Sequence, residues 1–530
     1  MELLKIEGLK IKTGDKVLVD ELNLSINRGE IISLVGESGS GKSLTCLSVL
    51  NLLPETLHPE GSIKYFEQDG SFSELLGMNS KQRKQYALCK IAYIFQEPLT
   101  ALNPVQKCGD QLFENLILCG YKGKEELKNK AIELLKSVEL NQTDKVLNAY
   151  PFQLSGGQRQ RVMIAMALAG NPDLIIADEP TTALDVIIQE EILELIRSLA
   201  KVHGKSVLLI SHDLDAVGRF SDRIAVMYKG KIIEQGIASE VFGHPKENYT
   251  KALLACKPTP DKKGYYLTTI QSEGEKPKPF VEPAASNEQM LSVNLLRKEF
   301  YLDDKVFRAL KSLSFDLYKG QSVGLIGESG SGKSTISKIL VNLESATGGT
   351  LEYDFDNKLS LSSNVQLIFQ DPFAALNPEI NVRSMLSEVI RKHGKNLSSS
   401  EVLELSIELL VKVGLTPEDL VKFPANFSGG QRQRLCIARA LAVNPTLLIC
   451  DESTSALDLS VQAQILNLLK ELQISEGLTI LMITHSMAVA AWFCQYLIVL
   501  KDGYIVEQGK TSDLIKNASN EYTRSLLQHI

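Results

Sequence analysis

The chain has 530 residues, which is more than one hydrophobic core usually organises, so length alone predicts two or more domains. Hydrophobic residues make up 44% of the chain and charged residues 23%, which is typical of a soluble globular protein. Lys and Arg number 57 against 64 Asp and Glu, and the formal net charge of -7 argues against a protein that wraps nucleic acid. We therefore expect no nucleic-acid partner.

The cysteines and the N-terminus bear on location. The eight cysteines show no CxxC pair or other metal-ligand spacing, so we expect buried, reduced thiols of a cytosolic protein. Residues 1–5 lack the basic and apolar regions of a signal peptide, and no uncharged apolar run approaches the ~20 residues needed to cross a bilayer. Any membrane role is therefore expected to go through a partner.

In chain order, residues 1–29 alternate as short strands with a turn at residues 13–15, and a helix is expected to end near residues 53–54. Residues 60–73 predict a hairpin with Asp69-Gly70 at its turn. A buried strand at residues 91–96 ends in Gln96, and residues 111–140 predict a helical region. Similar short helices are expected at residues 249–254 and 522–527.

One run of eight residues, Gly-Glu-Ser-Gly-Ser-Gly-Lys-Ser, occurs at residues 36–43 and again at 327–334. Each copy follows a short apolar run and precedes a stretch with helical spacing, which is the context of a phosphate-binding P-loop. Backbone N–H groups of such a loop surround phosphate oxygens, the lysine adds a cation, and the last serine hydroxyl is a ligand for Mg²⁺. An ordinary Gly/Ser loop is the alternative for one copy, but two identical copies make it negligible. The residues predicted to contact a nucleotide are Gly36, Ser38, Gly39, Gly41, Lys42, Ser43, Gly327, Ser329, Gly330, Gly332, Lys333 and Ser334.

Spacing shows that the two halves are an internal repeat. The P-loops lie 291 residues apart, the glutamines Gln96 and Gln370 lie 274 apart, and every later pair lies 273 apart. The first half therefore carries 17 additional residues between its P-loop and Gln96, expected to form a peripheral insertion. Residues 257–289 are polar and rich in proline, so we predict domains at 1–256 and 290–530 joined by a partly extended linker at 257–289.

Paired acids follow an apolar run in each half, Asp178-Glu179 and Asp451-Glu452. A buried parallel strand would deliver them to its C-terminal edge, where the first acid acts on Mg²⁺ through water and the second polarises the water that attacks the γ-phosphate. His212 and His485 each lie 33 residues beyond the glutamate. A lone histidine at a strand end is structural about half the time, but its repetition at one spacing favours a γ-phosphate contact.

Ser-Gly-Gly-Gln occurs at residues 155–158 and 428–431. Each copy predicts the start of a helix, with the serine as N-cap and glycines that let an anion approach the amide groups. Alone it is a weak signal, more often a plain helix start.

The order P-loop, Gln, Ser-Gly-Gly-Gln, apolar-Asp-Glu, Ala-Leu-Asp, His resembles the nucleotide-binding cassette of ATP-binding cassette (ABC) proteins, twice over almost the whole chain. The resemblance implies an α/β fold of two tandem P-loop NTPase cassettes, each with a mostly parallel core sheet, an antiparallel β subdomain and a helical subdomain. It also implies a head-to-tail cassette pair within the chain, with ATP between the P-loop of one cassette and the Ser-Gly-Gly-Gln of the other.

The resemblance assigns residues to two composite ATP sites. One would combine Lys42, Ser43, Gln96, Asp178, Glu179 and His212 with Ser428, Gly430 and Gln431. The other would combine Lys333, Ser334, Gln370, Asp451, Glu452 and His485 with Ser155, Gly157 and Gln158. The implied Mg²⁺ ligands are Ser43, Gln96 and Asp178, and Ser334, Gln370 and Asp451. Asp185 and Asp458 would sense the other half. Phe300 is the expected adenine-stacking aromatic of the second half, and Thr13 takes the aligned position in the first.

Residues 97–104, 150–155 and 164–168 resemble the ATPase subunits of bacterial dipeptide and oligopeptide importers, and the second half resembles their partner subunit. The tandem arrangement is similar to fused peptide or microcin-type importer ATPases. This implies an ATP hydrolase that powers solute uptake from the cytoplasmic face of the bacterial inner membrane. Its partners would be two integral-membrane permease subunits, whose coupling helices enter grooves after Gln96 and Gln370, and an external solute-binding protein.

Other functions remain open on sequence alone. A twin-cassette ATPase acting on the ribosome typically has a long, charged helical arm, whereas the linker here is short and bears proline. A binding module without hydrolysis is disfavoured because both glutamates and both histidines are present. An exporter ATPase would use the same motor chemistry. Peptide, glutathione and metal-chelate solutes are not separable.

Overall fold

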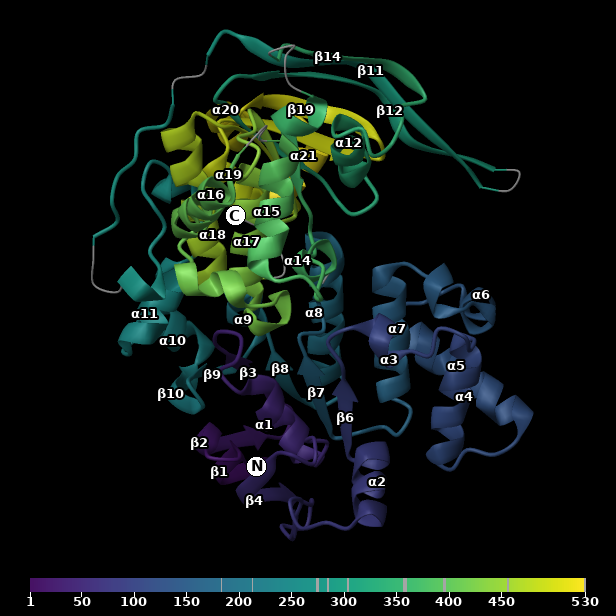
Figure 1. Cartoon of the computed structure of the whole chain (residues 1–530). Coiled ribbons are helices and arrows are strands. Elements are labelled where there is room, and N and C mark those ends of the chain that lie inside the picture. Colours follow the sequence, from purple (N-terminus) through teal and green to yellow (C-terminus); the bar gives the residue numbers. More distant parts are fainter. Residues whose placement is uncertain are drawn as a thin grey trace. The chain divides into compact units, whose positions relative to one another are not determined.

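The computed structural model describes residues 1–530 except 183, 212, 273–275, 284–285, 303–304, 356–359, 394–396, 455–456 and 529–530. The chain divides into two compact units, Met1–Leu254 and Ala255–Ile530 (Figure 1). We call them the first and second cassette and describe each by itself.

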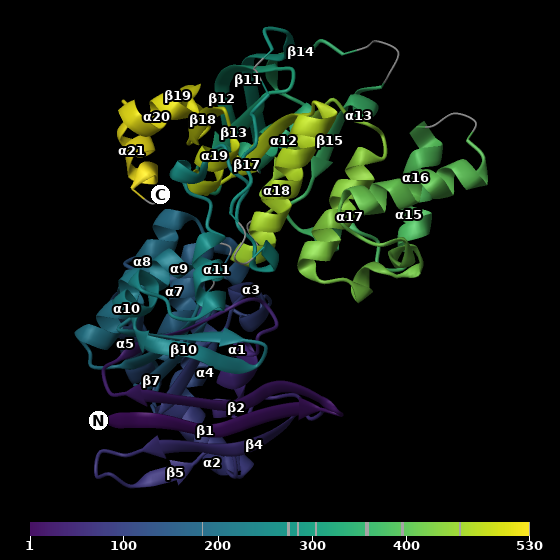
Figure 2. The same cartoon turned by 90° about the vertical axis from the view of Figure 1, so that its left-hand side faces the viewer.

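The first cassette contains two sheets. A four-stranded antiparallel sheet has the order β2-β1-β4-β5, and its first three strands lie side by side in Figure 2. Its strands are β1 (Glu2–Thr13), β2 (Lys16–Asn27), β4 (His58–Phe66) and β5 (Phe72–Glu74). The six-stranded core sheet has the order β10-β9-β3-β8-β7-β6 and is parallel except for β10. Its strands are β3 (Ile31–Val35), β6 (Ile91–Ile94), β7 (Leu174–Asp178), β8 (Ser206–Ile210), β9 (Arg223–Tyr228) and β10 (Lys231–Ile237).

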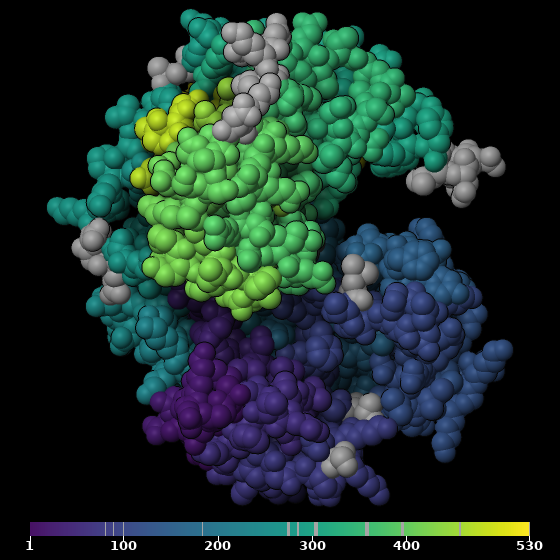
Figure 3. All heavy atoms as spheres, viewed as in Figure 1, coloured from purple at the N-terminus to yellow at the C-terminus, as the bar shows by residue number. Residues whose placement is uncertain are grey.

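The helices of the first cassette include a separate lobe made by α3 to α7. The space-filling view shows this lobe in blue, projecting beside the purple N-terminal residues of the same cassette (Figure 3). The helices are α1 (Lys42–Val49), α2 (Ser80–Cys89), α3 (Pro98–Ala101), α4 (Cys108–Leu118), α5 (Lys124–Ser137), α6 (Thr143–Asn148), η1 (Pro151–Gln153), α7 (Gly156–Ala167), α8 (Val186–Lys201), α9 (Leu214–Phe220), α10 (Ala238–Gly243) and α11 (Asn248–Ala255).

The second cassette repeats this plan. A three-stranded sheet, β12-β11-β14, is followed by a six-stranded core sheet, β15-β16-β17-β13-β18-β19, in which only β19 is antiparallel. The strands are β11 (Gln289–Leu302), β12 (Lys305–Tyr318), β13 (Ser322–Ile326), β14 (Gly348–Tyr353), β15 (Val365–Ile368), β16 (Leu447–Asp451), β17 (Thr479–Thr484), β18 (Tyr496–Lys501) and β19 (Tyr504–Lys510). The helices are η2 (Pro260–Lys262), η3 (Ile270–Ser272), α12 (Lys333–Leu340), α13 (Leu361–Asn364), α14 (Pro372–Ala375), α15 (Val382–His393), α16 (Ser399–Lys412), η4 (Pro417–Val421), η5 (Pro424–Asn426), α17 (Gly429–Leu441), α18 (Leu459–Glu476), α19 (Met487–Phe493), α20 (Thr511–Asn517) and α21 (Glu521–Leu527). The predicted fold class, two tandem cassettes of this kind, is confirmed.

The strand order places each P-loop at the middle of its core sheet. β3 pairs with β8 on one side and β9 on the other, and β13 pairs with β17 and β18 in the same way. All residues of β3, β7 and β8 are buried, as expected for strands covered on both faces. The loops at the carboxyl ends of such strands form the ligand-binding edge of an open α/β sheet.

Several local predictions are refined by the structure. The helical region predicted at residues 111–140 is two helices, because Gly120 and Gly123 take left-handed φ angles of 98° and 91° between them. The helix after the first P-loop ends at Val49, earlier than predicted, and residues 1–29 form two long strands instead of several short ones. The hairpin around Asp69-Gly70 and the similar final helices α11 and α21 are confirmed. The 17-residue excess lies near β5 and the mostly exposed helix α2.

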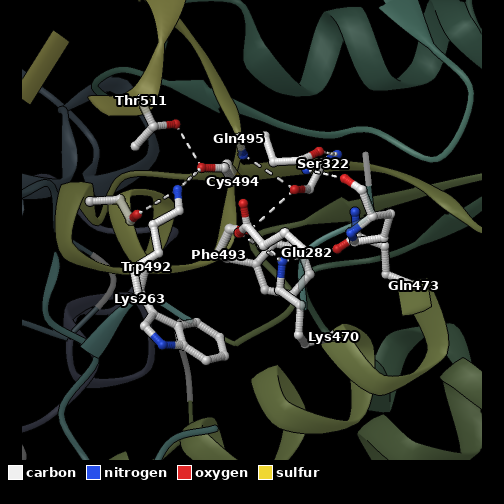
Figure 4. Close-up of polar contacts among 12 residues, drawn as sticks. Lys263, Glu282, Ser322, Lys470, Gln473, Trp492, Phe493, Cys494, Gln495 and Thr511 are labelled. Carbon is white, nitrogen blue, oxygen red and sulfur yellow. Dashed lines mark hydrogen bonds and ion pairs between the residues drawn. The ribbon is translucent and has the colours of Figure 1, made fainter. Parts of the chain in front are cut away.

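The segment between the cassettes packs against the second cassette, where the sequence predicted a partly extended linker at 257–289. We call its described residues from Ala255 to Pro283 the strap. Lys263 Nζ donates to the carbonyl oxygen of Cys494 at 2.6 Å (Figure 4). Trp492 Nε1 donates to the carbonyl oxygens of Lys262 and Tyr265 at 3.2 Å each. The division into units accordingly places this segment with the second cassette.

Two side chains of α18 complete the strap's docking face. Asn467 bonds both the backbone N–H and the carbonyl of Leu267, each at 2.8 Å. Lys470, which is fully buried, donates to the carbonyl oxygen of Phe493 at 2.7 Å and lies 3.8 Å from the Glu282 carboxylate of the strap (Figure 4). The strap is thus held by backbone and side-chain contacts on both α18 and α19.

The other bulk predictions concern cysteines and membrane spans. Six of the eight cysteines are buried, as predicted, whereas Cys89 is exposed and Cys119 half-buried. Within the part of the chain that the structure describes, none of the helices combines the length and apolar character needed to cross a membrane.

Candidate active sites

Each P-loop connects the end of a buried strand to the first turn of a helix, β3 to α1 and β13 to α12. A Cβ atom at Gly36 or Gly327 would overlap a carbonyl oxygen of the neighbouring strand, that of Met227 or Leu500. Only glycine fits this close approach, so the loop can wrap tightly around an anion.

The lysine of each loop is buried and points back into it. Lys42 Nζ donates to the carbonyl oxygens of Gly36 and Glu37 at 2.8 and 2.9 Å. Lys333 Nζ repeats the arrangement with Gly327 and Glu328 at 2.6 and 2.8 Å. The ammonium group therefore sits inside the loop, where it would meet the phosphates of a bound nucleotide.

Each loop also contains a buried serine hydroxyl, Ser40 Oγ or Ser331 Oγ, that has no hydrogen-bond partner among the described residues. A buried hydroxyl without a partner costs free energy, and a phosphate oxygen would satisfy it. The two loops thus fit the phosphates of a nucleotide.

The aspartate of each acid pair faces the P-loop serine. Ser43 Oγ donates to Asp178 Oδ1 at 3.2 Å, and Ser334 Oγ donates to Asp451 Oδ1 at 3.4 Å. Burial raises the pKa of both aspartates, and the neighbouring glutamate adds to the effect. The hydroxyl and carboxylate oxygens fit Mg²⁺. Among the described residues, there is no cluster of three or more His, Cys, Asp or Glu that could hold a metal alone, so the remaining ligands would be nucleotide oxygens and water.

The glutamate of each pair adopts a left-handed backbone conformation, with φ of 47° at Glu179 and 45° at Glu452. Successive residues of a regular strand point to opposite faces, so this turn lets the glutamate leave the strand pattern at its end. The turned carboxylate meets the glutamine at the end of the adjacent strand. Gln96 Nε2 donates to Glu179 Oε2 at 2.7 Å, and Gln370 Nε2 donates to Glu452 Oε2 at 2.8 Å.

The predicted histidine can be placed in the second cassette. His485 Nδ1 lies 3.7 Å and Lys333 Nζ lies 3.8 Å from Glu452 Oε1. Burial alone would raise the pKa of Glu452, but these two groups together hold it below its ordinary value, which keeps the glutamate ionised. His212 lies outside the described residues.

The Ser-Gly-Gly-Gln residues lie at the starts of α7 and α17. Ser155 and Ser428 are the N-caps of α7 and α17, as predicted, and each forms a reciprocal capping box with Gln158 or Gln431. A Cβ atom on Gly157 or Gly430 would overlap Ile188 of α8 or Val461 of α18. Asp185 and Asp458 are the N-caps of those two helices, so Gly157 and Gly430 each pack beside the turn that begins at the candidate sensing aspartate.

The pairing of residues across the two long hairpins shows which residues occupy equivalent candidate adenine positions. Phe300 pairs with Phe307 across the β11–β12 hairpin, and Thr13 pairs with Lys16 across β1–β2. The pairs Glu2–Asn27 and Gln289–Tyr318 at the other end of the two hairpins show the same offsets. Thr13 therefore takes the place of Phe300, as predicted.

Sequence reasoning missed two sets of residues. The Tyr249 hydroxyl accepts from the backbone N–H of Glu37, and the Tyr522 hydroxyl accepts from that of Glu328, each at 3.1 Å. The repeated tyrosine at the start of the final helices was a signal for this support of the P-loop. The second set, Tyr93 and Ser337, bonds the aspartates and carried no repeat signal, because the two residues are not at equivalent positions.

Residues 19–182 and 310–455 match the family model described as ABC transporter, more than half of the chain. The chain belongs to the ABC transporter family. It is an ABC transporter ATP-binding protein and an ATPase. Residues 233–282, which include most of the strap, match the model described as the oligopeptide/dipeptide transporter C-terminal region.

Relatives of this ABC transporter protein align along nearly its whole length. It is 40% identical to the uncharacterized ABC transporter ATP-binding protein YejF of Escherichia coli (strain K12), covering 99% of each chain. It is 40% identical to the glutathione import ATP-binding protein GsiA of the same strain, covering 96% of this chain and 86% of GsiA. Among solved structures, the archaeal ribosome recycling factor aABCE1, in complex with ribosomal stalk protein aP1, is 22% identical with a TM-score of 0.61, covering 96% of this chain and 90% of that one. This last likeness shows the fold alone.

Proposed function

We propose that the protein is the ATP-binding and hydrolysing subunit that powers a membrane permease for uptake of peptides or similar small solutes. The observation that carries the uptake role is the match of residues 233–282 to the oligopeptide/dipeptide transporter C-terminal region, together with the name of the glutathione import relative. We assign residues 1–256 and 290–530 to the two nucleotide-binding domains, with residues 257–289 as their connection.

Each ATP site is proposed to use both cassettes. Ser428, Gly430 and Gln431 would complete the site that contains Lys42, Ser43, Gln96, Asp178, Glu179 and His212. Ser155, Gly157 and Gln158 would complete the site that contains Lys333, Ser334, Gln370, Asp451, Glu452 and His485. The hydrogen bonds among the P-loop lysine and serine and the Asp, Glu and Gln side chains within each cassette support the part of each set that one cassette contributes. The contribution of the other cassette rests on the resemblance alone.

The chain's own residues have distinct tasks in ATP hydrolysis. The P-loop amides and Lys42 or Lys333 bind the phosphates, and Ser43 with Asp178, or Ser334 with Asp451, would hold Mg²⁺. The metal supplies charge neutralisation of the phosphates when bound. Glu179 or Glu452 orients the attacking water and takes its proton, while Gln96 or Gln370 fixes the glutamate through its amide N–H and can offer its amide oxygen to the metal.

We propose two integral-membrane permease subunits and an external solute-binding protein as partners, with the chain peripheral on the cytoplasmic face of the bacterial inner membrane. A cavity of about 200 Å³ in the first cassette supports a docking groove there. Residues on both sides of Gln96 in the chain line it, with apolar and polar side chains of the core and the helical lobe that include Phe95, Leu102, Asn115, Met163 and Met166.

Affinity purification of the tagged chain from solubilised bacterial membranes tests this function. We expect two polytopic membrane proteins to be recovered with it. Recovery of ribosomal proteins instead would reverse the assignment in favour of a soluble ATPase acting on the ribosome. Transport assays with inverted vesicles then separate uptake from export, because ATP-driven solute entry into such vesicles would indicate an exporter.

A further inference from the structure

Both oxygens of each buried active-site aspartate receive a hydrogen bond from a hydroxyl group. The Oδ1 atoms are bonded by equivalent residues, the P-loop serines Ser43 and Ser334. The Oδ2 atoms are bonded by residues from different elements. Tyr93 of β6 donates its hydroxyl to Asp178 Oδ2 at 2.7 Å, whereas Ser337 of α12 donates to Asp451 Oδ2 at 2.8 Å.

The strand supplies the donor in the first cassette and the helix supplies it in the second. Tyr93 and Leu367 are equivalent, because Tyr93 pairs with Ile176 and Leu367 pairs with Ile449 in matching parallel ladders. Ser337 is the fifth residue of α12, and the fifth residue of α1 is Cys46. The first cassette thus combines tyrosine with cysteine, and the second combines leucine with serine.

Leu367 and Cys46, which occupy the positions equivalent to Tyr93 and Ser337, could not supply this hydrogen bond. Leucine has no donor, and a thiol is a weak one. Cys46 is fully buried in the same hydrophobic cluster against which Tyr93 packs, so the long tyrosine reaches the aspartate over a small residue. In the second cassette the serine on the helix reaches Asp451 itself, and the strand position carries only an apolar side chain that packs in the core.

A buried carboxylate oxygen without a donor is costly and free to turn away from the P-loop serine. A hydroxyl on Oδ2 fixes the plane of the carboxylate and keeps Oδ1 directed to that serine. We propose that Tyr93 and Ser337 are positioning residues that orient Asp178 and Asp451 for the metal ion that accompanies the nucleotide. Each cassette has one such hydrogen bond, which comes from β6 in the first cassette and from α12 in the second. This inference rests on the proposed ATP sites and adds two residues to them.

The test uses the full chain with Glu179→Gln and Glu452→Gln as parent, so that bound nucleotide is not turned over. Mn²⁺, a spectroscopic substitute for Mg²⁺, is titrated into the ATP-saturated protein, and its binding is followed by electron paramagnetic resonance. Tyr93→Phe and Tyr93→Leu should weaken Mn²⁺ binding at one of two sites by about tenfold, the size expected for one hydrogen bond to a charged group. Adding Cys46→Ser to Tyr93→Leu copies the second cassette and should restore the affinity.

Matched variants separate positioning from folding. Tyr86→Phe removes a hydroxyl of the same cassette that bonds Ser73 at 2.8 Å, and it should leave Mn²⁺ affinity unchanged. Ser337→Ala should weaken the other site, and metal-free binding of a fluorescent ATP analogue should be the same in all variants. Unchanged Mn²⁺ affinity in Tyr93→Phe, or no recovery on adding Cys46→Ser, would overturn the inference while leaving the ATP sites intact. A parent that binds no ATP at all would overturn the proposed sites and this inference with them.

Discussion

At the scale of single residues, adjacent acids at one strand end carry different partners. Asp178 and Asp451 remain in the strand and bond hydroxyl groups, while Glu179 and Glu452 turn out of it and bond glutamine amides. The sequence predicted these acids and glutamines, because each is repeated at a fixed spacing. It could not predict Tyr93 or Ser337, because side-chain donors at non-equivalent positions leave no repeated pattern.

The two candidate ATP sites differ at the residue expected to stack on adenine. Phe300 offers an aromatic ring where the first cassette has Thr13. An aromatic pair contributes about 0.5–1.5 kcal/mol beyond its buried area, so the Lys333 site should bind a fluorescent ATP analogue roughly three- to tenfold more tightly than the Lys42 site. Titration of Lys42→Ala and Lys333→Ala proteins measures each remaining site, and equal affinities would rule this out. Phe300→Ala should lower the affinity of the Lys333 site, with Thr13→Ala as the matched control.

At the scale of elements, the strap is the largest departure from the sequence interpretation. Its composition, polar and rich in proline, is typical of a linker, and it does not indicate which surface of the chain the strap packs against. The face lies on α18 and α19, at Asn467, Lys470 and Trp492. The positions 273 residues earlier in the first cassette are Glu194, Arg197 and Arg219. In the sequence, the contact surface therefore shows itself as a difference between α18–α19 and the otherwise similar pair α8–α9. This difference could be interpreted after the structure had shown the strap packed against α18 and α19.

Trp492 should hold the strap in place. Its ring is fully buried, and its N–H bonds two strap carbonyls, so Trp492→Ala should cost about 3–5 kcal/mol of local stability. The released strap would expose the peptide bonds after Lys262 and Lys263 to trypsin. We expect cleavage there to accelerate at least tenfold, measured by mass spectrometry of timed digests. Arg219→Ala, at the equivalent and half-exposed position of α9, is the control, and similar cleavage rates in the two variants would contradict this role.

Lys470 should make the stability of the second cassette depend on pH. Burial lowers the pKa of Lys470 from 10.5 to about 8, despite the nearby Glu282 carboxylate. Between these two values the unfolded chain binds more protons than the folded one, so the cost of burying the charge is full below about pH 8 and is relieved as pH rises toward 10.5. Wild type should therefore gain stability relative to Lys470→Gln between pH 7.5 and 9.5, measured by urea unfolding at each pH. A difference between the two proteins that does not change with pH would contradict this assignment.

At the scale of the whole molecule, the two-cassette fold was predictable from the sequence. Each P-loop, glutamine, Ser-Gly-Gly-Gln run and acid pair follows a strand or opens a helix, so the repeated order of these residues predicts the order of the elements. Element bounds were less predictable, since they depend on local breaks such as Gly120 and Gly123. The solute was not predictable, because the residues proposed for these sites would contact nucleotide and not the transported solute.

The most direct test of the central claim, a pair of ATP sites that turn over through Glu179 and Glu452, is steady-state ATP hydrolysis by the Glu179→Gln, Glu452→Gln protein. Glutamine keeps the shape of the side chain but cannot take a proton from the attacking water, so turnover should fall at least about 100-fold while ATP binding is preserved. Glu240→Gln, an exposed acid of α10, should hydrolyse ATP at the wild-type rate. Normal turnover in the double variant would contradict the account.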